Sequence, residues 1–332
     1  MIRSVSLMLI LTPALAFGQG RLGVDFTPGL IKLVPGVYAY EGPLNGYCCD
    51  INRKVPLKPG EQDIVRTNSL VVVTDEGVVV ADGQDNPDLG RQMLAEIRKV
   101  TDKPIRYMIN ASPHGDHSNS NEVFKSAGAI FVAHRNARDA MVRTNQNPNA
   151  RIKPPLPDIV YNDEMTLFVG GKRIELHYFG PGHTLGDTAV YLPDDKVLFM
   201  SENYFSNIFI SVGEGHMLKS EWLDTVAKAM QLDAVWVIPG HGQISGLSAA
   251  QLKTGFQKCY DMVQTLYDNV KRHVDRGDSL EKTMAEFDSE AGEFAKLSFY
   301  ESSVPGLAGL KERSVRATYN RLAGRPIGTG AR

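Results

Sequence analysis

Four of the eight histidines lie in short loops, each where a β-strand is expected to end. The densest group is the run SPHGDH at residues 112–117, which places His114, Asp116 and His117 within four residues. Histidine nitrogen and aspartate oxygen are both common ligands of zinc. Because a polar loop can also hold such side chains through local hydrogen bonds, this run alone leaves a metal site and a structural loop both open.

Two further histidines favour the metal site. His183 lies in the run GPGHTLGD at residues 180–187, between two expected strands, and His241 lies in IPGHG at residues 238–242, directly after a strand. The glycines beside each histidine allow the backbone to turn sharply. Functional side chains favour loops of this kind on a rigid scaffold. The three loops together predict that the imidazoles converge on a divalent cation.

The elements that must position these loops alternate between strands and helices. Residues 30–34 and 37–40 flank a Pro-Gly turn and predict a hairpin, and residues 69–74 and 77–82 predict a second pair of strands. Asn86 and Pro87 start a helix that extends to Val100. Further strands are expected at 106–110, 130–133, 173–179, 188–192, 196–200 and 234–238, and further helices at 121–126, from 134 through 141, and at 221–230, 248–275, 279–287 and 310–322. Two successive mixed halves predict two sheets with helices outside them.

The three histidine loops, in this order and spacing, resemble those of the metallo-β-lactamase superfamily over about residues 30–245. The resemblance implies an α/β fold: a four-layer αββα sandwich of two mixed sheets with outer helices, followed by C-terminal helices. It implies a metallo-β-lactamase-like domain at residues 20–247 and a helical extension packed on it at residues 248–332. The stretch VTDKPIRY at residues 100–107 is similar to exported superfamily members linked to quinoprotein systems.

The resemblance also implies a set of metal ligands. One ion would be held by His114 and His183, a second by Asp116, His117 and His241, and Glu202 stands where many members have a bridging aspartate. Two positions depart from the family pattern. The first histidine of the family motif is Ser112 here, a much poorer ligand than imidazole, and the bridging acid is one methylene longer. We therefore expect one tightly bound zinc and a second, weaker one at His114/His183, with iron or manganese as other possible metals.

Zinc-bound water has a pKa of about 7, so hydroxide is available at neutral pH. The resemblance thus implies a metal-dependent hydrolase that directs this hydroxide at the carbonyl of an ester, lactone, thioester or amide, with Asp116 as the catalytic residue that orients it. One alternative is a β-lactamase that hydrolyses the β-lactam amide. Another is a degenerate metal-binding or structural module, suggested by Ser112, and a third is a mononuclear iron oxygenase on the same scaffold.

Composition limits the partners. The 332 residues carry 36 basic and 38 acidic side chains, a formal charge of −2, and 42 % of the residues are hydrophobic, which is typical of a folded globular protein. This balance gives no reason to expect nucleic-acid or membrane binding, so we expect a small-molecule substrate and leave the oligomeric state open. Residues 1–16 combine Arg3, a short apolar run and an Ala-Leu-Ala ending, which predicts a cleaved signal peptide and a periplasmic or secreted protein.

The remaining candidates are less specific. Three cysteines, with no C-x-x-C spacing, are too few for a disulfide scaffold, and pairing of Cys48 or Cys49 with Cys259 depends on the fold. We expect structural or solvated roles for the histidines outside the three loops, which are His134, His177, His216 and His273. The segment at residues 42–61 is a candidate to overhang the site. The aromatic residues Tyr204, Phe205 and Phe209 fit either core packing or an apolar wall of the site.

Overall fold

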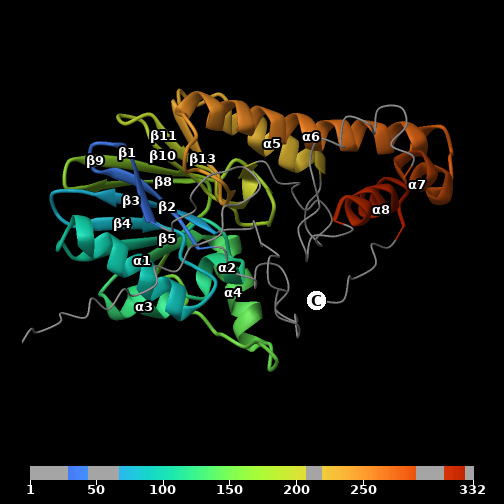
Figure 1. Ribbon diagram of the computed structural model, residues 1–332. Helices are drawn as coiled ribbons and strands as arrows, with labels where there is room; N and C mark the ends of the chain where they lie inside the picture. Colours follow the sequence, from blue (N-terminus) through green and yellow to red (C-terminus); the bar gives the residue numbers. More distant parts are fainter. Residues whose placement is uncertain (1–28, 44–66, 207–218, 289–309, 326–332) are drawn as a thin grey trace, which may run out of the picture.

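A computed structural model describes residues 29–43, 67–206, 219–288 and 310–325. Within these residues two β-sheets lie face to face, and helices cover their outer sides (Figure 1). Several predictions concern residues outside the described ranges. These are the expected signal peptide, residues 44–61 of the segment expected to overhang the site, Cys48, Cys49, Phe209 and His216. In the described part, no helix combines the length and apolar character needed to cross a bilayer.

The first sheet contains seven strands in chain order. They are β1 (Gly29–Val34), β2 (Val37–Glu41), β3 (Asn68–Val73), β4 (Val78–Ala81), β5 (Ile105–Asn110), β6 (Ile130–His134) and β7 (Ile159–Tyr161). The pairs from β1 to β4 are antiparallel, and those from β4 to β7 are parallel. The helices α1 (Pro87–Val100), α3 (Asn121–Ser126) and α4 (Arg135–Gln146) connect the parallel strands.

The second sheet has five strands in the order β13 (Trp236–Ile238), β11 (Val197–Phe199), β10 (Ala189–Leu192), β9 (Lys172–His177) and β8 (Glu164–Val169). Only β11 and β13 pair in parallel. A separate ribbon of two short strands, β12 (Phe205–Ser206) and β14 (His241–Gly242), lies beside it. The helices α5 (Lys219–Ala229) and α6 (Ala249–Asp275) pack on the outer face of this sheet.

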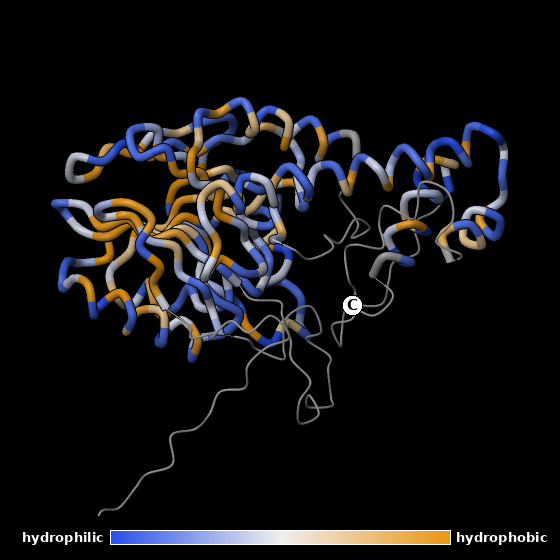
Figure 2. Tube along the Cα trace, turned by 45° about the horizontal axis from the view of Figure 1, so that its top comes forward, coloured by the Kyte–Doolittle hydropathy of each residue, from blue (hydrophilic) through white to orange (hydrophobic). Residues whose placement is uncertain are grey.

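Alternation along the strands divides the interior into three hydrophobic cores. In β4, Val79 and Ala81 face the space between the sheets, whereas Val78 and Val80 face α1 and α3. In β10, Val190 faces the space between the sheets and Tyr191 faces α5 and α6. Two-sided burial of this kind follows from the period of two along a strand. Figure 2 shows the resulting concentration of hydrophobic residues in the strands. The expected four-layer αββα sandwich is therefore confirmed.

The local sequence explains where the helices start. Asn86 caps α1 by accepting a hydrogen bond from Leu89 N, and Pro87 occupies the first turn, where its missing N–H needs no partner. At α6, Ser248 and Gln251 form a reciprocal capping box. Some predictions were incomplete: α4 continues to Gln146 rather than ending near residue 141, and β7 and β8 were not predicted.

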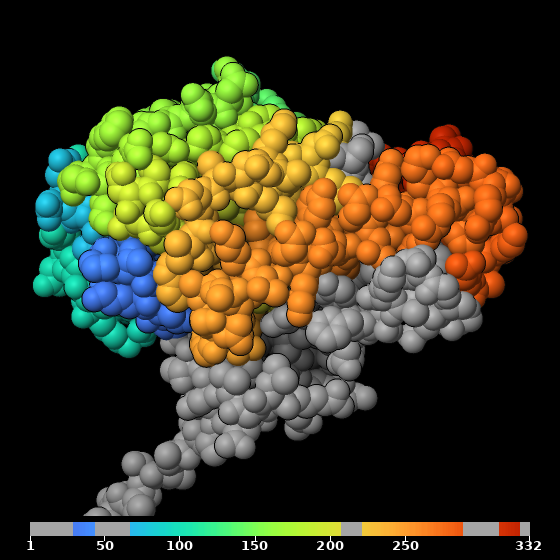
Figure 3. Space-filling model, turned by 90° about the horizontal axis from the view of Figure 1, so that it is seen from above, coloured from blue at the N-terminus to red at the C-terminus, as the bar shows by residue number. Residues whose placement is uncertain are grey.

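The C-terminal helices extend away from the sandwich. The 27-residue α6 packs first against β13 and α5, and its far half contacts α8 (Leu310–Leu322), which also packs on α7 (Leu280–Asp288). The space-filling view shows α6 lying across one face of the molecule and continuing beyond the sheets (Figure 3). Cys259 lies buried within α6 and forms no disulfide with any residue of the described part of the chain.

Three hydrogen bonds join the beginning of the described chain to the residues on the two sides of β14. Glu41, at the end of β2, accepts hydrogen bonds from Ile244 N at 3.3 Å and Ser245 N at 2.9 Å. Asn68, at the start of β3, donates from its backbone N to Gly240 O at 2.8 Å. These contacts span more than 170 residues of sequence and fix one edge of the sandwich.

Candidate metal centre

The residues of the three histidine loops meet at this edge. Asp116 and His117 lie on the one-turn helix α2 (Gly115–Ser118), which follows β5. His183 lies between β9 and β10, Glu202 lies in a 3₁₀ turn (Ser201–Asn203) after β11, and His241 begins β14. Each position follows the end of a strand, so the sheets bring together side chains that are up to 127 residues apart.

One group of ligand-type atoms consists of Asp116, His117, His241 and Glu202, all within 4.8 Å of one another. The Nε2 atoms of His117 and His241 are 3.1 Å apart. Asp116 Oδ2 lies 3.3 Å from His241 Nε2 and 3.7 Å from His117 Nε2. Glu202 Oε1 completes the group at 3.6 Å from His241 Nε2.

The second group shares Glu202 with the first and adds His114 and His183. His114 Nδ1 lies 2.7 Å from Glu202 Oε2, and His183 Nε2 lies 3.6 Å from Oε1. Every residue predicted as a ligand therefore belongs to one of the two groups, and Glu202 belongs to both.

The six ligand-type residues differ in exposure. The side chains of His117, His183, Glu202 and His241 are at most 4 % exposed. Asp116 is 15 % exposed and His114 is 23 % exposed. Asp116 and His114 are therefore the ligand-type side chains most accessible to a small molecule.

The electrostatics of the centre favour a bound cation. Burial alone would lower the pKa of His117, but the carboxylates of Asp116, Asp82 and Glu202 raise it to about 10. Burial would raise the pKa of Glu202, but the imidazoles of His114, His183 and His117 hold it well below its usual range. Burial of this much carboxylate is unfavourable unless positive charge compensates it.

The donor set fits a divalent metal ion. Four imidazoles and two carboxylates converge in a largely buried space, and these are the nitrogen and oxygen donors that zinc accepts. His183 Nδ1 is buried with no hydrogen-bond partner in the described structure, whereas its Nε2 faces Glu202. The residues present therefore fit a metal, with His117, His241 and Asp116 as one candidate set and His114, His183 and Glu202 as the other.

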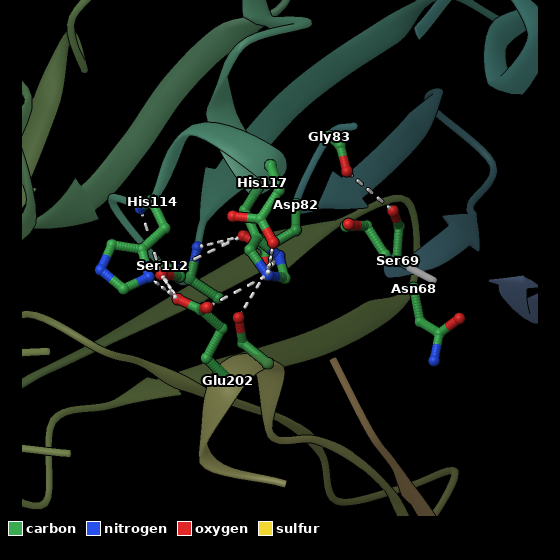
Figure 4. Close-up of polar contacts among 12 residues, drawn as sticks. Asn68, Ser69, Asp82, Gly83, Ser112, His114, His117 and Glu202 are labelled. Atoms are coloured by element: carbon green, nitrogen blue, oxygen red, sulfur yellow. Dashed lines mark hydrogen bonds and ion pairs between the residues drawn. The ribbon is translucent and has the colours of Figure 1, made fainter. Parts of the chain in front are cut away.

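Asp82 lies behind the His117 ring and was not among the site residues predicted from the sequence. Its Oδ2 lies 3.0 Å from His117 Nδ1 and accepts a hydrogen bond from Ser201 Oγ at 2.5 Å, while its Oδ1 accepts one from Ala111 N at 2.7 Å (Figure 4). A carboxylate behind a ligating histidine fixes the ring orientation and tautomer. The available signal was an acidic residue at the end of the predicted strand 77–82.

Two asparagines position the loops that carry His183 and His241. Asn203 Oδ1 accepts a hydrogen bond from His183 N at 2.9 Å, and a Cβ at Gly182 would lie 2.2 Å from that same oxygen. Asn68 Nδ2 donates to Pro239 O and Gly242 O on the two sides of His241. Neither asparagine carries a sequence signal that distinguishes it from other polar residues at strand ends.

The other described histidines have different contacts. His134 caps α4 and lies 2.6 Å through Nε2 from Asn162 O, His177 lies 3.0 Å from Glu175, and His273 lies 2.9 Å from Asp278. Of the aromatic candidates, Phe205 packs edge-on against the His241 ring, with centroids 4.5 Å apart, so it lines the centre. Tyr204 is buried and donates to Leu252 O at the start of α6, so it belongs to the core.

Comparison with known proteins places this arrangement in a family. The family model for the metallo-beta-lactamase superfamily matches residues 63–241, more than half of the chain. The chain therefore belongs to the metallo-beta-lactamase superfamily. The resemblance of residues 100–107 to quinoprotein-linked members remains loose.

Individual relatives are distant. The chain is 23 % identical over 212 residues to the 2,4-dinitroanisole O-demethylase subunit alpha of Nocardioides sp. (strain JS1661), a match that covers 62 % of each chain. It is 24 % identical over 189 residues to a metallo-beta-lactamase type 2 of Elizabethkingia meningoseptica, covering 55 % of this chain and 72 % of that one. The match to the first of these relatives thus spans less than two thirds of its length.

A solved structure is similar over a longer part of the chain. The stereoselective inverting sec-alkylsulfatase of Pseudomonas sp. superposes with a TM-score of 0.64 and 18 % sequence identity. The superposition covers 91 % of this chain and 51 % of the sulfatase. At this identity, the similarity establishes a common fold.

Proposed function

We propose that the protein is an exported, zinc-dependent hydrolase that cleaves a carbonyl group of a small molecule such as an ester, lactone, thioester or amide. The observation that carries the proposal is the convergence of Asp116, His117, Glu202 and His241, whose ligand-type atoms lie within 4.8 Å of one another. The family relationship supports it, because this is a superfamily of metal-dependent hydrolases.

The metal assignment follows from the donors. We propose that Asp116, His117 and His241 hold the more tightly bound zinc and that His114, His183 and Glu202 hold a second, weaker one. A bound zinc ion lowers the pKa of water and polarises a carbonyl oxygen. Six residues supply the protein donors for both ions.

Asp116 is the proposed catalytic residue. Its side chain is 15 % exposed, and its Oδ2 lies close to the Nε2 atoms of both His117 and His241. An acidic oxygen in this place can accept a hydrogen bond from an attacking water molecule and orient it toward the substrate. Phe205 provides an apolar surface beside the His241 ring.

A second candidate, a β-lactamase, is favoured by the curated relatives of that name. It uses the same centre and differs only in the amide that is cleaved. The sulfatase and demethylase names of other relatives add an alkyl sulfate and an aryl methyl ether to the substrates that merit testing.

The test combines metal analysis with a substrate panel. The purified chain should contain at least one zinc, and it should hydrolyse at least one of an aryl ester, a lactone, a thioester and nitrocefin. His117→Ala should lose both zinc and turnover, whereas His177→Ala, a histidine outside both groups, should retain both. Far less than one metal per chain after expression with zinc would contradict the proposal. Nitrocefin turnover no faster than that of His117→Ala would exclude the β-lactamase candidate.

The export proposal has its own test. Expression in a bacterium, fractionation and mass analysis should give a periplasmic or secreted chain shortened near residue 16. A full-length chain in the cytoplasmic fraction would contradict it, without bearing on the metal centre.

A further inference from the structure

The two positions that depart from the family pattern contact each other. Ser112 Oγ donates a hydrogen bond to Glu202 Oε2, and both side chains are buried (Figure 4). His114 Nδ1 lies 2.7 Å from the same oxygen. The serine that replaces a histidine and the glutamate that replaces an aspartate therefore meet at a single atom.

Glu202 reaches into both groups of ligand-type atoms. Its Oε2 lies at Ser112 and His114, and its Oε1 lies 3.6 Å from the Nε2 atoms of both His183 and His241. A serine side chain is much smaller than an imidazole, so position 112 leaves room that the additional methylene of glutamate can use. The Glu202 carboxylate thus lies next to residue 112, the position at which the family has a histidine.

Ser112 is held so that its hydroxyl proton points to this carboxylate. The backbone N–H of Ser112 donates to Asp82 Oδ1 at 3.2 Å, and its Oγ accepts a hydrogen bond from His114 N at 3.3 Å. A hydroxyl has a single proton to donate. Because the side chain is buried, Glu202 is the acceptor of this hydrogen bond and is oriented by it.

We propose that Ser112 and Glu202 act as one coupled unit in place of the family's histidine and aspartate. Ser112 is the positioning residue, and Glu202 supplies the third protein donor of the second metal site, beside His114 and His183. This inference rests on the proposed metal centre. It makes the second site a two-histidine, one-carboxylate site in which Ser112 is not a lost ligand.

The first experiment measures zinc affinity without recourse to turnover. Metal-free full-length chain is titrated with zinc against a competing chelator, and wild type should bind two ions. Ser112→Ala should weaken the second ion about 10–100-fold, the range found when a residue that orients a ligand is lost. Ser112→Thr, which keeps the hydroxyl, should restore most of that affinity. Ser69→Ala is the matched control, since Ser69 is also a buried serine but donates to the backbone oxygen of Gly83.

The second experiment exchanges the pair. Ser112→His alone should weaken the second ion, because the imidazole enters the space that Glu202 Oε2 occupies, and Glu202→Asp alone should weaken it by withdrawing that oxygen. The double variant Ser112→His/Glu202→Asp should bind the second ion within several-fold of wild type. Cobalt(II) absorption provides a second readout of the site, and circular dichroism of the metal-free variants shows that each is folded.

Different results would contradict the Ser112–Glu202 inference and the proposed metal centre. If wild type binds two zinc ions and Ser112→Ala binds both equally well, the inference fails and the metal centre stands. Tighter zinc binding by Ser112→His alone would show that Ser112 is a lost ligand, and additive losses in the double variant would show that the pair is not coupled. Binding of less than one zinc by wild type would overturn both the metal centre and the inference.

Discussion

Asp82 Oδ2 lies 3.0 Å from Nδ1 of His117, and neither side chain is exposed to solvent. The opposite nitrogen of the same ring, Nε2, lies 3.1 Å from Nε2 of His241. Asp82 thus presents the His117 ring to the centre in one tautomer. Asp82 itself has a φ of 61°, a left-handed conformation that few residues other than glycine, asparagine and aspartate adopt.

Replacement of Asp82 by asparagine should weaken zinc binding about 10–100-fold, as is typical when the carboxylate behind a ligating histidine is removed. Asparagine tolerates the left-handed backbone and keeps the size of the side chain, so the change isolates the charge. Zinc titration of Asp82→Asn and of Asp88→Asn, an exposed carboxylate in the first turn of α1, provides the comparison. Equal affinity in the two variants would contradict this role for Asp82.

Gly240→Ala should destabilise the fold and the site together. A Cβ at residue 240 would lie 2.3 Å from the backbone C and O of Ser201 and 2.9 Å from Glu202 N, so backbone on both sides must shift. Overpacking of this kind costs about 1–3 kcal/mol. Urea unfolding should show that loss, and zinc affinity should fall because His241 and Glu202 move. At Gly29 the nearest atom lies 3.9 Å away, so Gly29→Ala should change neither quantity.

Zinc removal should lower the melting temperature. The metal-free centre keeps several carboxylates buried near one another, and an ion that binds only the folded state stabilises it by about 2.7 kcal/mol when present at 100 times its dissociation constant. Thermal unfolding with a chelator, and then with increasing zinc, measures the effect. In His117→Ala/His241→Ala the zinc-dependent shift should disappear, and an unchanged shift would place the stabilising ion elsewhere.

His134 should make stability depend on pH. Burial lowers the pKa of His134 below its ordinary value. The unfolded chain therefore binds the proton more readily than the folded chain, and this histidine favours unfolding as the pH falls through about 6.5. The stability advantage of wild type over His134→Gln should be larger at pH 7.5 than at pH 5.5 in urea unfolding with chelator present. The corresponding difference for Asn136→Ala, a neighbour that does not titrate, should be the same at both pH values.

The residues of the centre could be predicted because their chemistry is local in sequence. The run SPHGDH and the glycines beside His183 and His241 each mark a loop that follows a strand. Strand ends at one edge of a sandwich lie together, so the loops converge without knowledge of the exact pairing. The order of expected strands and helices along the chain predicted the two sheets and the helices that cover them.

The supporting contacts could not be predicted, because they depend on long-range geometry. Nothing near Asp82 in the sequence indicates that it meets a histidine 35 residues later, and the Ser112–Glu202 contact joins residues 90 apart. The strands β7 and β8 were missed for a different reason. β7 has only three residues. In β8 burial does alternate, but Phe168 on the exposed face is apolar and 78 % exposed, so the sequence itself shows no clear hydrophobic alternation.

The contacts of Glu41 with Ser245 and of Asn68 with Gly240 have a consequence for the order of events during biosynthesis. The loop that carries His241 is secured by strands from the opposite end of the domain, and it emerges from the ribosome after all the other donors. An ion therefore cannot meet the full set of donors until residue 241 has left the ribosome. The metal taken up by the proposed centre would then depend on the supply at the time when this loop docks against β2 and β3.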